Sequence, residues 1–231
     1  MNYIILNGKH SDFVQGLLIQ SLPPISKPLL RTQVETVDGR DGDRVTPLGY
    51  SAYDKTFSIG LHGHFDIDDV IKFFDSEGTV TFSNEPYKYY QYKTIAQIDF
   101  ERLVRFKTAN VTFHVQPFKY SAVEKAKTFD VVGKNEISIQ NNGNVKAKPV
   151  MTLYGTGTIT MSLNGVQVFN INLLDEITID VAQMEAYTGG TLKNRQVRGN
   201  YDEFLLTTGI NNISWTGNLS RIEIDKYSRW I

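Results

Sequence analysis

The stretch Val37-Asp38-Gly39-Arg40-Asp41-Gly42-Asp43-Arg44 separates two segments with the composition of β-strands, residues 29–37 and 53–61. It holds three carboxylates beside two arginines, and its two glycines allow the chain to turn sharply. Such a stretch fits two descriptions. It is either a loop that binds a metal ion or a rigid, charged turn that another protein chain grips, and the choice bears directly on function.

The charges of this stretch (Asp38, Arg40, Asp41, Asp43 and Arg44) match a calcium loop poorly. Calcium loops of the helix–loop–helix type place ligands at alternate positions and end in a bidentate glutamate. Here the carboxylates are spaced by three and then two residues, and no glutamate occurs among the twelve residues after Asp38. Two arginines can offset two carboxylates without a metal. We therefore predict ion pairs, within the chain or between chains.

Most of the remaining sequence has the pattern of β-strands. Polar and apolar side chains alternate in residues 56–61, 111–115, 159–163 and 177–181, which places one face of each strand in a core. The predicted fold class is all-β, apart from one short α-helix.

The predicted helix covers approximately residues 66–77. Its apolar side chains recur with the spacing of an amphipathic helix, at residues 67, 70, 71 and 74. Asp66 is a suitable N-cap, and Gly78 follows where the helix should stop.

Composition excludes several classes of protein. The formal net charge is -1, with 24 basic and 25 acidic side chains, which argues against general nucleic-acid binding. Cysteine is absent, so disulfides, thiol catalysis and cysteine-ligated zinc are excluded. No stretch approaches the ~18 apolar residues of a membrane span, and no secretory signal is recognisable. We expect a soluble protein made in the cytoplasm.

The composition changes near residues 119–135. All four histidines precede residue 120, whereas asparagine and glycine become frequent at predicted turns after residue 130. We therefore expect two domains, residues 1–128 and 129–231. The pair Asn164-Gly165 lies between alternating runs and predicts a two-residue hairpin. The second domain is predicted to be a sandwich of seven or more short strands.

Two further segments have more than one interpretation. If His62, His64 and Asp66 lie in a strand, they share a face and can bind a metal, but Asp66 is better used as the helix cap, which favours ordinary polar residues. The segment Tyr87-Lys88-Tyr89-Tyr90-Gln91-Tyr92-Lys93 can stack bases or sugars, or lie between a core and a partner protein. The neutral charge of the chain favours the second interpretation.

Motifs of catalysis are not recognisable. Residues 49–53 lack the closing glycine of a nucleophile elbow, and Gly155-Thr156-Gly157 lacks the third glycine of a dinucleotide site, which indicates a turn. A pair of glycosidase carboxylates is recognised by the distance between the two carboxyl groups, which a sequence does not give. We predict no enzyme activity, no catalytic residues, no cofactor and no metal.

The order of these segments resembles the distal tail protein (Dit) family of long-tailed phages that infect Gram-positive bacteria. In the first half, the resemblance rests on the Gly-Arg-Asp-Gly turn at 39–42, the strand at 53–59, the single helix and the run Phe113-His114-Val115-Gln116-Pro117-Phe118. In the second half, it rests on Asn141-Asn142-Gly143-Asn144, Asn164-Gly165 and Gly209-Ile210-Asn211-Asn212. It covers nearly the whole chain.

The resemblance implies a structural protein of the virion tail tip (baseplate), assembled in the host cytoplasm. It implies an N-terminal β-sandwich that forms a homohexameric ring and a C-terminal galectin-like β-sandwich. The ring would join the tail tube protein to a tail-associated or receptor-binding protein, with phage DNA passing through it, without sequence-specific nucleic-acid contacts and without a membrane. Asp38, Arg40, Asp41, Asp43 and Arg44 are then candidates for the ring interface. The candidates for partner docking are Tyr87, Tyr89, Tyr90 and Tyr92.

An alternative function is recognition of a cell-wall saccharide by the C-terminal sandwich. Galectin sites use histidine, arginine and asparagine with a stacking tryptophan, but the second half has no histidine. Trp215 is the candidate stacking residue, although the alternation around it fits a core position equally well.

Overall fold

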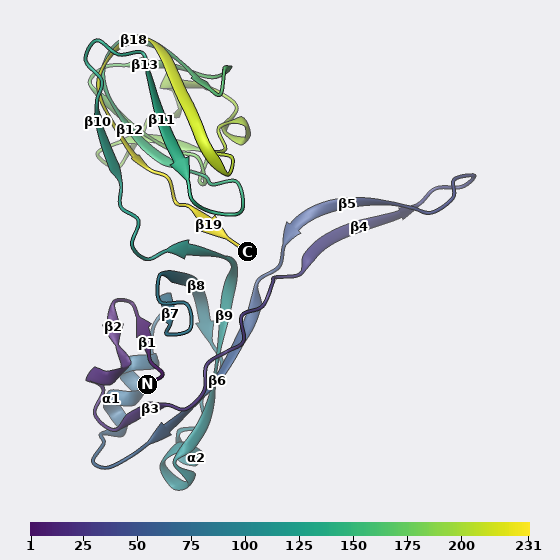
Figure 1. Ribbon diagram of the computed structural model, residues 1–231, viewed down its shortest axis with the longest axis vertical. Coiled ribbons are helices and arrows are strands. Elements are labelled where there is room, and N and C mark those ends of the chain that lie inside the picture. The colour runs from purple at the N-terminus through teal and green to yellow at the C-terminus, as the bar shows by residue number, and fades with distance from the viewer. The chain divides into compact units, whose positions relative to one another are not determined.

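The computed structural model describes residues 1–231, which divide into two compact units (Figure 1). Unit 1 comprises residues 1–122 with residue 231, and unit 2 comprises residues 123–230. Each unit has its own hydrophobic core. The division falls a few residues before the boundary expected from composition.

Unit 1 is built on one antiparallel sheet of strand order β2-β1-β7-β8-β9-β6-β3. Its strands are β1 (Ile4–Leu6), β2 (Lys9–His10), β3 (Leu17–Ile19), β6 (Tyr53–Leu61), β7 (Gly78–Phe82), β8 (Lys88–Ile95) and β9 (Thr108–Ser121). The sandwich expected for this half is therefore realised as a single hydrogen-bonded sheet, against which two helices pack.

The alternation predicted for residues 56–61 and 111–115 is confirmed in β6 and β9. These strands pair from Tyr53↔Val115 to Gly60↔Thr108, and their apolar side chains are buried. Phe113 lies at the centre of the core: its ring centroid is 5.7 Å from that of Phe57 and 4.8 Å from that of Tyr92.

The predicted helix is confirmed as α1 (Ile67–Phe74). The Asp66 side chain caps it by accepting a hydrogen bond of 2.9 Å from the backbone N–H of Asp68. Val70, Phe73 and Phe74 are buried against the sheet, which explains why the helix forms here.

The prediction of a single helix is wrong, because α2 (Phe100–Phe106) precedes β9. Phe100, Leu103 and Val104 do have the spacing of an amphipathic helix, but the segment is only seven residues long and Leu103 is its only buried residue, so the pattern is too short to identify a helix from sequence. Three short 3₁₀ turns complete the helical structure, at Ser11–Phe13, Asn194–Gln196 and Tyr201–Glu203.

Neither α-helix is long and apolar enough to cross a membrane.

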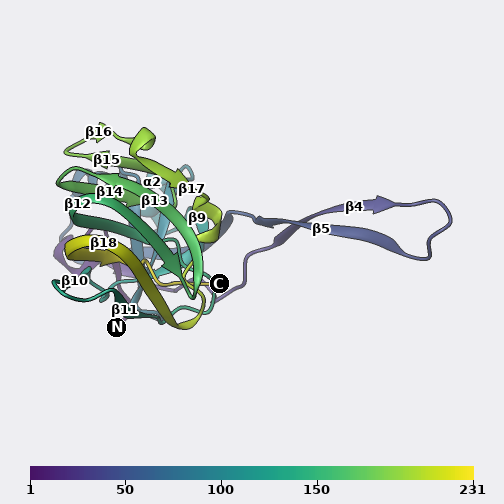
Figure 2. The ribbon, with the colours of Figure 1, turned by 90° about the horizontal axis from the view of Figure 1, so that it is seen from above.

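Strands β4 (Leu30–Thr36) and β5 (Asp43–Tyr50) form a hairpin that pairs with no other strand. Figures 1 and 2 show it as a ribbon of two strands with no third strand beside it. We refer to residues 29–50 as the arm and to residues 37–42 as its tip.

Two long strands, β12 (Val150–Leu163) and β18 (Gly209–Asp225), organise unit 2. The other strands of its sheet are β10 (Lys127–Asp130), β11 (Glu136–Asn141), β13 (Val166–Leu173), β14 (Glu176–Asp180), β15 (Glu185–Thr188), β16 (Thr191–Leu192) and β17 (Val197–Gly199). The short strand β19 (Arg229–Trp230) follows β18 and is not part of this sheet. Residues 150–154 of β12 lie between β14 and residues 221–225 of β18, whereas residues 160–163 lie between β13 and residues 213–216. The two long strands thus contribute to both layers of a sandwich.

Glycines allow these strands to pass from one layer to the other. The pairing of β12 with β18 shifts register between Tyr154 and Gly155 and again between Thr156 and Thr160. Gly157 and Gly217 have φ angles of +91° and +100°. The prediction of a turn at Gly155–Gly157 is therefore wrong, because the glycines bend a continuous strand.

The predicted hairpin at Asn164-Gly165 is confirmed. It joins β12 to β13 with Leu163 opposite Val166, and both turn residues have positive φ, +50° and +84°. This is the backbone that the favoured two-residue hairpin turn requires.

Substitution of Gly217 should destabilise unit 2. A Cβ at this position would collide with the carbonyl oxygen of Thr158, and the positive φ adds strain. We expect Gly217→Ala to lower the free energy of unfolding by roughly 2–4 kcal/mol. Urea unfolding followed by tryptophan fluorescence measures this.

Gly157→Ala is the matched control, because Gly157 also has positive φ but no atom lies within 4 Å of the added Cβ. Its loss should be about 1 kcal/mol. Equal losses for the two variants would contradict the collision as the cause.

Candidate interaction surface

The arm is exposed over its whole length. Its strands pair from Thr36↔Asp43 to Leu30↔Tyr50, with a bulge between Arg31 and Thr32, and every residue from 29 to 49 is exposed. An isolated two-stranded hairpin is marginally stable in water, so the arm requires support from elsewhere.

The two faces of the arm differ in chemistry. Alternation along the paired strands places Leu30, Val34, Val45 and Pro47 on one face and Arg31, Gln33, Glu35, Arg44 and Thr46 on the other. The first face, which we call the apolar face, also carries Thr32 and the pair Thr36 and Asp43. Val34 and Val45 are directly opposite each other, and each is 55% exposed. The middle of this face is therefore apolar and open to solvent, which is the usual mark of an interaction surface.

The tip has the charged, glycine-shaped turn that the sequence predicts, and its own residues form no ion pairs with one another. Gly39 and Gly42 have φ angles of +78° and +77°, and the backbone N–H of Arg40 donates to the carbonyl oxygen of Val37 at 3.2 Å. The side chains of Asp38, Arg40 and Asp41 make no hydrogen bond or ion pair within the chain.

The remaining two charges of the stretch stabilise the arm itself. Asp43 accepts a hydrogen bond of 3.1 Å from the Thr36 hydroxyl across the strands, and the Arg44 guanidinium lies 3.9 Å from the Glu35 carboxylate. Glu35 is the partner that sequence reasoning missed. Once residues 29–50 are recognised as a hairpin, the strand register places Glu35 opposite Arg44 and identifies it as the partner.

No three acidic or histidine side chains gather as a metal site requires. This holds for the carboxylates of the tip and for His62 and His64, which lie in the turn before α1. His114 instead lies 2.7 Å from Asp54, across β6 and β9.

The segment that leads into the arm is held at Pro23 and Pro24 by polar side chains of unit 1, and we refer to these two residues as the root of the arm. The Lys55 ammonium donates to the carbonyl oxygen of Pro24 at 2.8 Å, and the Asn84 amide donates to that of Pro23 at 3.0 Å. Lys55 is only 2% exposed, and its Nζ lies 4.8 Å from the Tyr90 ring centroid. Burial lowers the pKa of Lys55 to about 8, with the charge of Glu85 opposing and that of Lys119 assisting this shift.

Glu85 balances the buried cations around this root. It accepts hydrogen bonds from the Tyr90 hydroxyl at 2.7 Å and from the Lys119 ammonium at 2.9 Å. Burial raises the pKa of Glu85, but these two hydrogen bonds together with the charges of Lys119 and Lys88 outweigh it, so the pKa lies below its usual value. The cluster is enclosed and provides no access for a substrate.

The four tyrosines predicted to dock a partner divide between surface and core. Tyr90 and Tyr92 are 0% and 1% exposed, so their prediction as docking residues is wrong: both rings belong to the aromatic core. Tyr87 is 69% exposed and fits an interaction surface. Tyr89 is half-buried and stacks on Tyr120, with ring centroids 5.6 Å apart.

Unit 2 does not present Trp215 to a ligand. This residue is 4% exposed and packs in the core of the sandwich. The stacking residue of the alternative saccharide-binding function is therefore a core residue.

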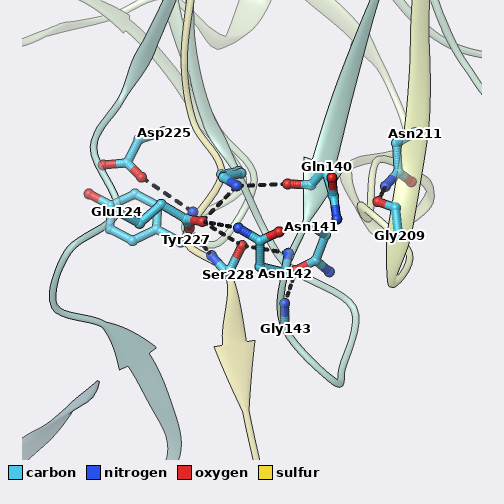
Figure 3. Close-up of polar contacts among 11 residues, drawn as sticks. Glu124, Gln140, Asn141, Asn142, Gly143, Gly209, Asn211, Asp225, Tyr227 and Ser228 are labelled. Carbon is cyan, nitrogen blue, oxygen red and sulfur yellow. Dashed lines mark hydrogen bonds and ion pairs between the residues drawn. The ribbon is translucent and has the colours of Figure 1, made fainter. Parts of the chain in front are cut away.

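Asparagines of unit 2 close turns (Figure 3). Asn211 donates to the carbonyl oxygens of Thr207 at 2.7 Å and Gly209 at 3.0 Å, and Asn141 accepts from the backbone N–H of Gly143 at 2.9 Å. Both are buried, at 0% and 1% exposed. These contacts account for the asparagine-rich segments as structural elements.

A buried network around Glu124 joins the beginning of unit 2 to its end (Figure 3). The Lys226 ammonium lies 2.6 Å from the Glu124 carboxylate and donates to the carbonyl oxygen of Gln140 at 2.7 Å. The backbone N–H of Ser228 donates to Glu124 at 2.9 Å, and the Asn142 amide donates to it at 3.3 Å. Sequence reasoning missed this network, because its members are far apart in the chain.

The network is structural. Lys226 and Ser228 are 3% and 0% exposed, so neither the ammonium group of Lys226 nor the hydroxyl of Ser228 is accessible to a substrate. Burial raises the pKa of Glu124, but the hydrogen bonds from Lys226 and Ser228 lower it by more, and it lies below its usual value.

The fold is similar to that of a phage protein of known structure. The SPP1 Dit (gp 19.1) protein, described as a paradigm of the hub adsorption apparatus in Gram-positive infecting phages, matches with a TM-score of 0.66. The match covers 97% of this chain and 98% of that one at 15% sequence identity. The chain thus has the fold of this Dit protein.

Two structures of the phage P2 baseplate in its activated conformation, with Ca and with Sr, also match, each at 12% identity over 97% of both chains, with TM-scores of 0.48 and 0.47. No protein-family model and no curated protein matches the sequence.

The Glu124 network should make the stability of unit 2 depend on acid. The pKa of Glu124 is lower in the folded chain than its ordinary value of 4.5, so the unfolded chain binds more protons near this pH. The stabilisation is present above about pH 4.5 and is lost as the pH falls through the lowered pKa. Urea unfolding between pH 3 and 7, followed by tryptophan fluorescence, measures it.

Glu124→Gln is the reference for this measurement. Asp225, whose pKa is raised by burial, acts in the opposite sense, but it is present in both proteins. The variant should be less stable at pH 7, since Lys226 is left buried without its counter-charge, by roughly 3–5 kcal/mol. Its stability should also fall less between pH 5 and 3. Parallel pH curves would contradict the role of Glu124.

Lys55 should impose a pH dependence of the same sign on unit 1, but in the alkaline range. Its pKa is about 8 in the folded chain and 10.5 ordinarily, so the folded chain binds fewer protons between these values. Stability should therefore rise from pH 8 towards pH 10 in the wild type, and this rise should be absent in Lys55→Met. Above pH 10 the raised pKa values of the buried tyrosines oppose the effect.

Urea unfolding followed by circular dichroism provides the comparison. Lys127→Met is the control, because Lys127 is an exposed residue of unit 2. An equal rise in wild type and Lys55→Met would show that Lys55 is not the titrating group.

Proposed function

We propose that the protein is a structural hub of a phage tail tip. In this proposal, unit 1 of six chains closes a homohexameric ring that joins the tail tube protein to a tail-associated or receptor-binding protein. Phage DNA passes through the ring, and unit 2 is a galectin-like sandwich on which partner proteins dock. The protein then belongs to the virion and assembles in the host cytoplasm. The similarity to the fold of SPP1 Dit supports this assignment.

The apolar face of the arm is the observation that carries the proposal. Val34 and Val45 form an exposed pair at its centre, and Leu30 and Pro47 extend it. Such a strip is stable only when another surface covers it, and the chain leaves it uncovered. A ring supplies the cover, because each chain then places its arm on the next.

The candidate residues of the tip take different roles in such a ring. Asp38, Arg40 and Asp41 have side chains available for a neighbouring chain, whereas Asp43 and Arg44 shape the arm through Thr36 and Glu35. Tyr87 is the tyrosine that a docking partner would contact. The role is non-enzymatic, as the fold similarity to a hub protein supports.

A charge on the apolar face of the arm should prevent assembly. Val45→Asp removes apolar burial and places a carboxylate in the interface, which costs about 2–3 kcal/mol and weakens association at least ~10-fold. Thr46→Asp is the matched control, since the neighbouring side chain points to the polar face. Its effect should be less than about twofold.

Multi-angle light scattering and negative-stain images of the purified protein over a range of concentrations measure assembly. We expect rings of six wild-type chains at high concentration, or on purified tail tubes if the tube nucleates them. Wild-type protein that stays monomeric under both conditions would contradict the proposal.

A further inference from the structure

In a closed ring each chain presents two different surfaces that fit one another, so a chain with an arm must also carry the surface that receives it. The end of the arm defines what that surface needs. Asp38 and Asp41 are carboxylates without a partner, and Val37 is 43% exposed between the strand and the turn. A suitable receiver is hollow, lined by cations without partners, and includes an exposed apolar side chain.

A groove along α2 in unit 1 has these properties. It consists of two hollows of about 500 and 190 Å³ that share Asp99 and Arg102. The larger hollow is also lined by Glu101, Arg105 and Phe106, and the smaller one by Gln97, Thr108, Ala109 and Asn110.

The two arginines of the groove form no ion pairs, although the Glu101 carboxylate also lines the larger hollow. Arg102 makes no side-chain ion pair, and the Arg105 guanidinium has only the ring of Phe106 beside it, at 5.4 Å. Asp99 is used as the helix cap, where it accepts from the backbone N–H of Arg102 at 2.8 Å. Phe106 and Val104 are 63% and 40% exposed, a large apolar area for so short a helix.

We propose that the groove along α2 receives the tip of the arm of a neighbouring copy of this chain. Asp38 and Asp41 then face Arg102 and Arg105, and Val37 packs against Phe106. Each side offers what the other lacks: unpaired carboxylates meet unpaired guanidinium groups, the pairing that forms the strongest charge-assisted hydrogen bonds. This inference rests on the proposed ring and specifies its contact.

Another hollow of the chain offers a competing receiver. The hollow at Leu192–Gln196 includes Lys193 and Arg195, with Leu192 59% exposed, but it belongs to unit 2. The hollow beside Tyr154 holds Arg221, which is already engaged by Glu223 at 3.3 Å and by the Tyr154 ring at 3.8 Å. The α2 groove is favoured because it lies in unit 1, which carries the arm and which the proposed function assigns to the ring.

Cysteine cross-linking tests the contact directly, since the chain has no cysteine of its own. Chains with Asp41→Cys are mixed with chains carrying Arg102→Cys and oxidised under assembly conditions. A disulfide-linked pair of the two variants is expected. Mixing Asp41→Cys with Arg195→Cys, which tests the competing hollow, should give no linked pair. Linkage to Arg195→Cys alone would overturn the proposal.

Exchange of charges provides a second test that does not depend on oxidation. Asp38→Arg with Asp41→Arg, and separately Arg102→Asp with Arg105→Asp, should each weaken assembly at least ~10-fold, because like charges then meet. A chain with all four substitutions should recover most of the wild-type assembly. Circular dichroism verifies that each variant is folded.

The outcomes separate the two proposals. If wild-type rings form but neither the cross-link nor the charge recovery is observed, the α2 groove is not the receiver and the ring stands. If wild-type chains never assemble, alone or on tail tubes, both proposals fail.

Discussion

A two-stranded ribbon cannot bury either of its own faces, and the proposed function follows from this constraint. In the sheets of both units, alternation places one set of side chains in a core. In the arm, the same alternation places Val34 and Val45 against solvent, with hydrogen bonds along only one edge of each strand. The polar face needs no cover, but the apolar face favours one. In the proposed ring, the arm is half of an interface, and association with a neighbouring chain supplies the energy that covers it.

The buried cluster at the root of the arm, with Lys55 at its centre, holds the arm in place but lowers the stability of unit 1. Enclosing the ammonium of Lys55 lowers its pKa to about 8, so part of the folding energy is used to keep the cation beside the carbonyl oxygen of Pro24. An apolar side chain would pack there without that cost. The ammonium instead provides a directed contact that fixes where the chain leaves the sheet. A fixed root restricts the directions available to the arm and reduces the entropy lost when it docks.

Short sequence patterns correctly predicted the elements that depend on interactions between neighbouring residues. The cap at Asp66 and the apolar spacing of α1 lie within one short segment, and Asn164-Gly165 determines its hairpin through its own backbone angles. Distant contacts decide the rest. Tyrosine suits both a core and an interface, so the pattern at 87–92 cannot tell which rings are enclosed, and the structure places Tyr90 and Tyr92 beneath the sheet. Helix α2 spans seven residues, and its apolar spacing at Phe100, Leu103 and Val104 is too short to separate a helix from a loop.

Glu85 and Glu124 show why such sites escape sequence reasoning. Each is a buried carboxylate beside a lysine: Lys119 lies 34 positions from Glu85, and Lys226 lies still further from Glu124. Neither glutamate belongs to a sequence motif, because sequence motifs consist of residues that lie close together in the chain. Each pair accompanies the attachment of a segment without strand partners: Lys55, whose charge Glu85 balances, holds the root of the arm, and Glu124 itself lies in the first residues of unit 2. A segment outside a sheet cannot satisfy its backbone by pairing, so side chains that reach it from the core must do so. Buried charge in this fold is therefore concentrated at the points where chain segments leave the sheets.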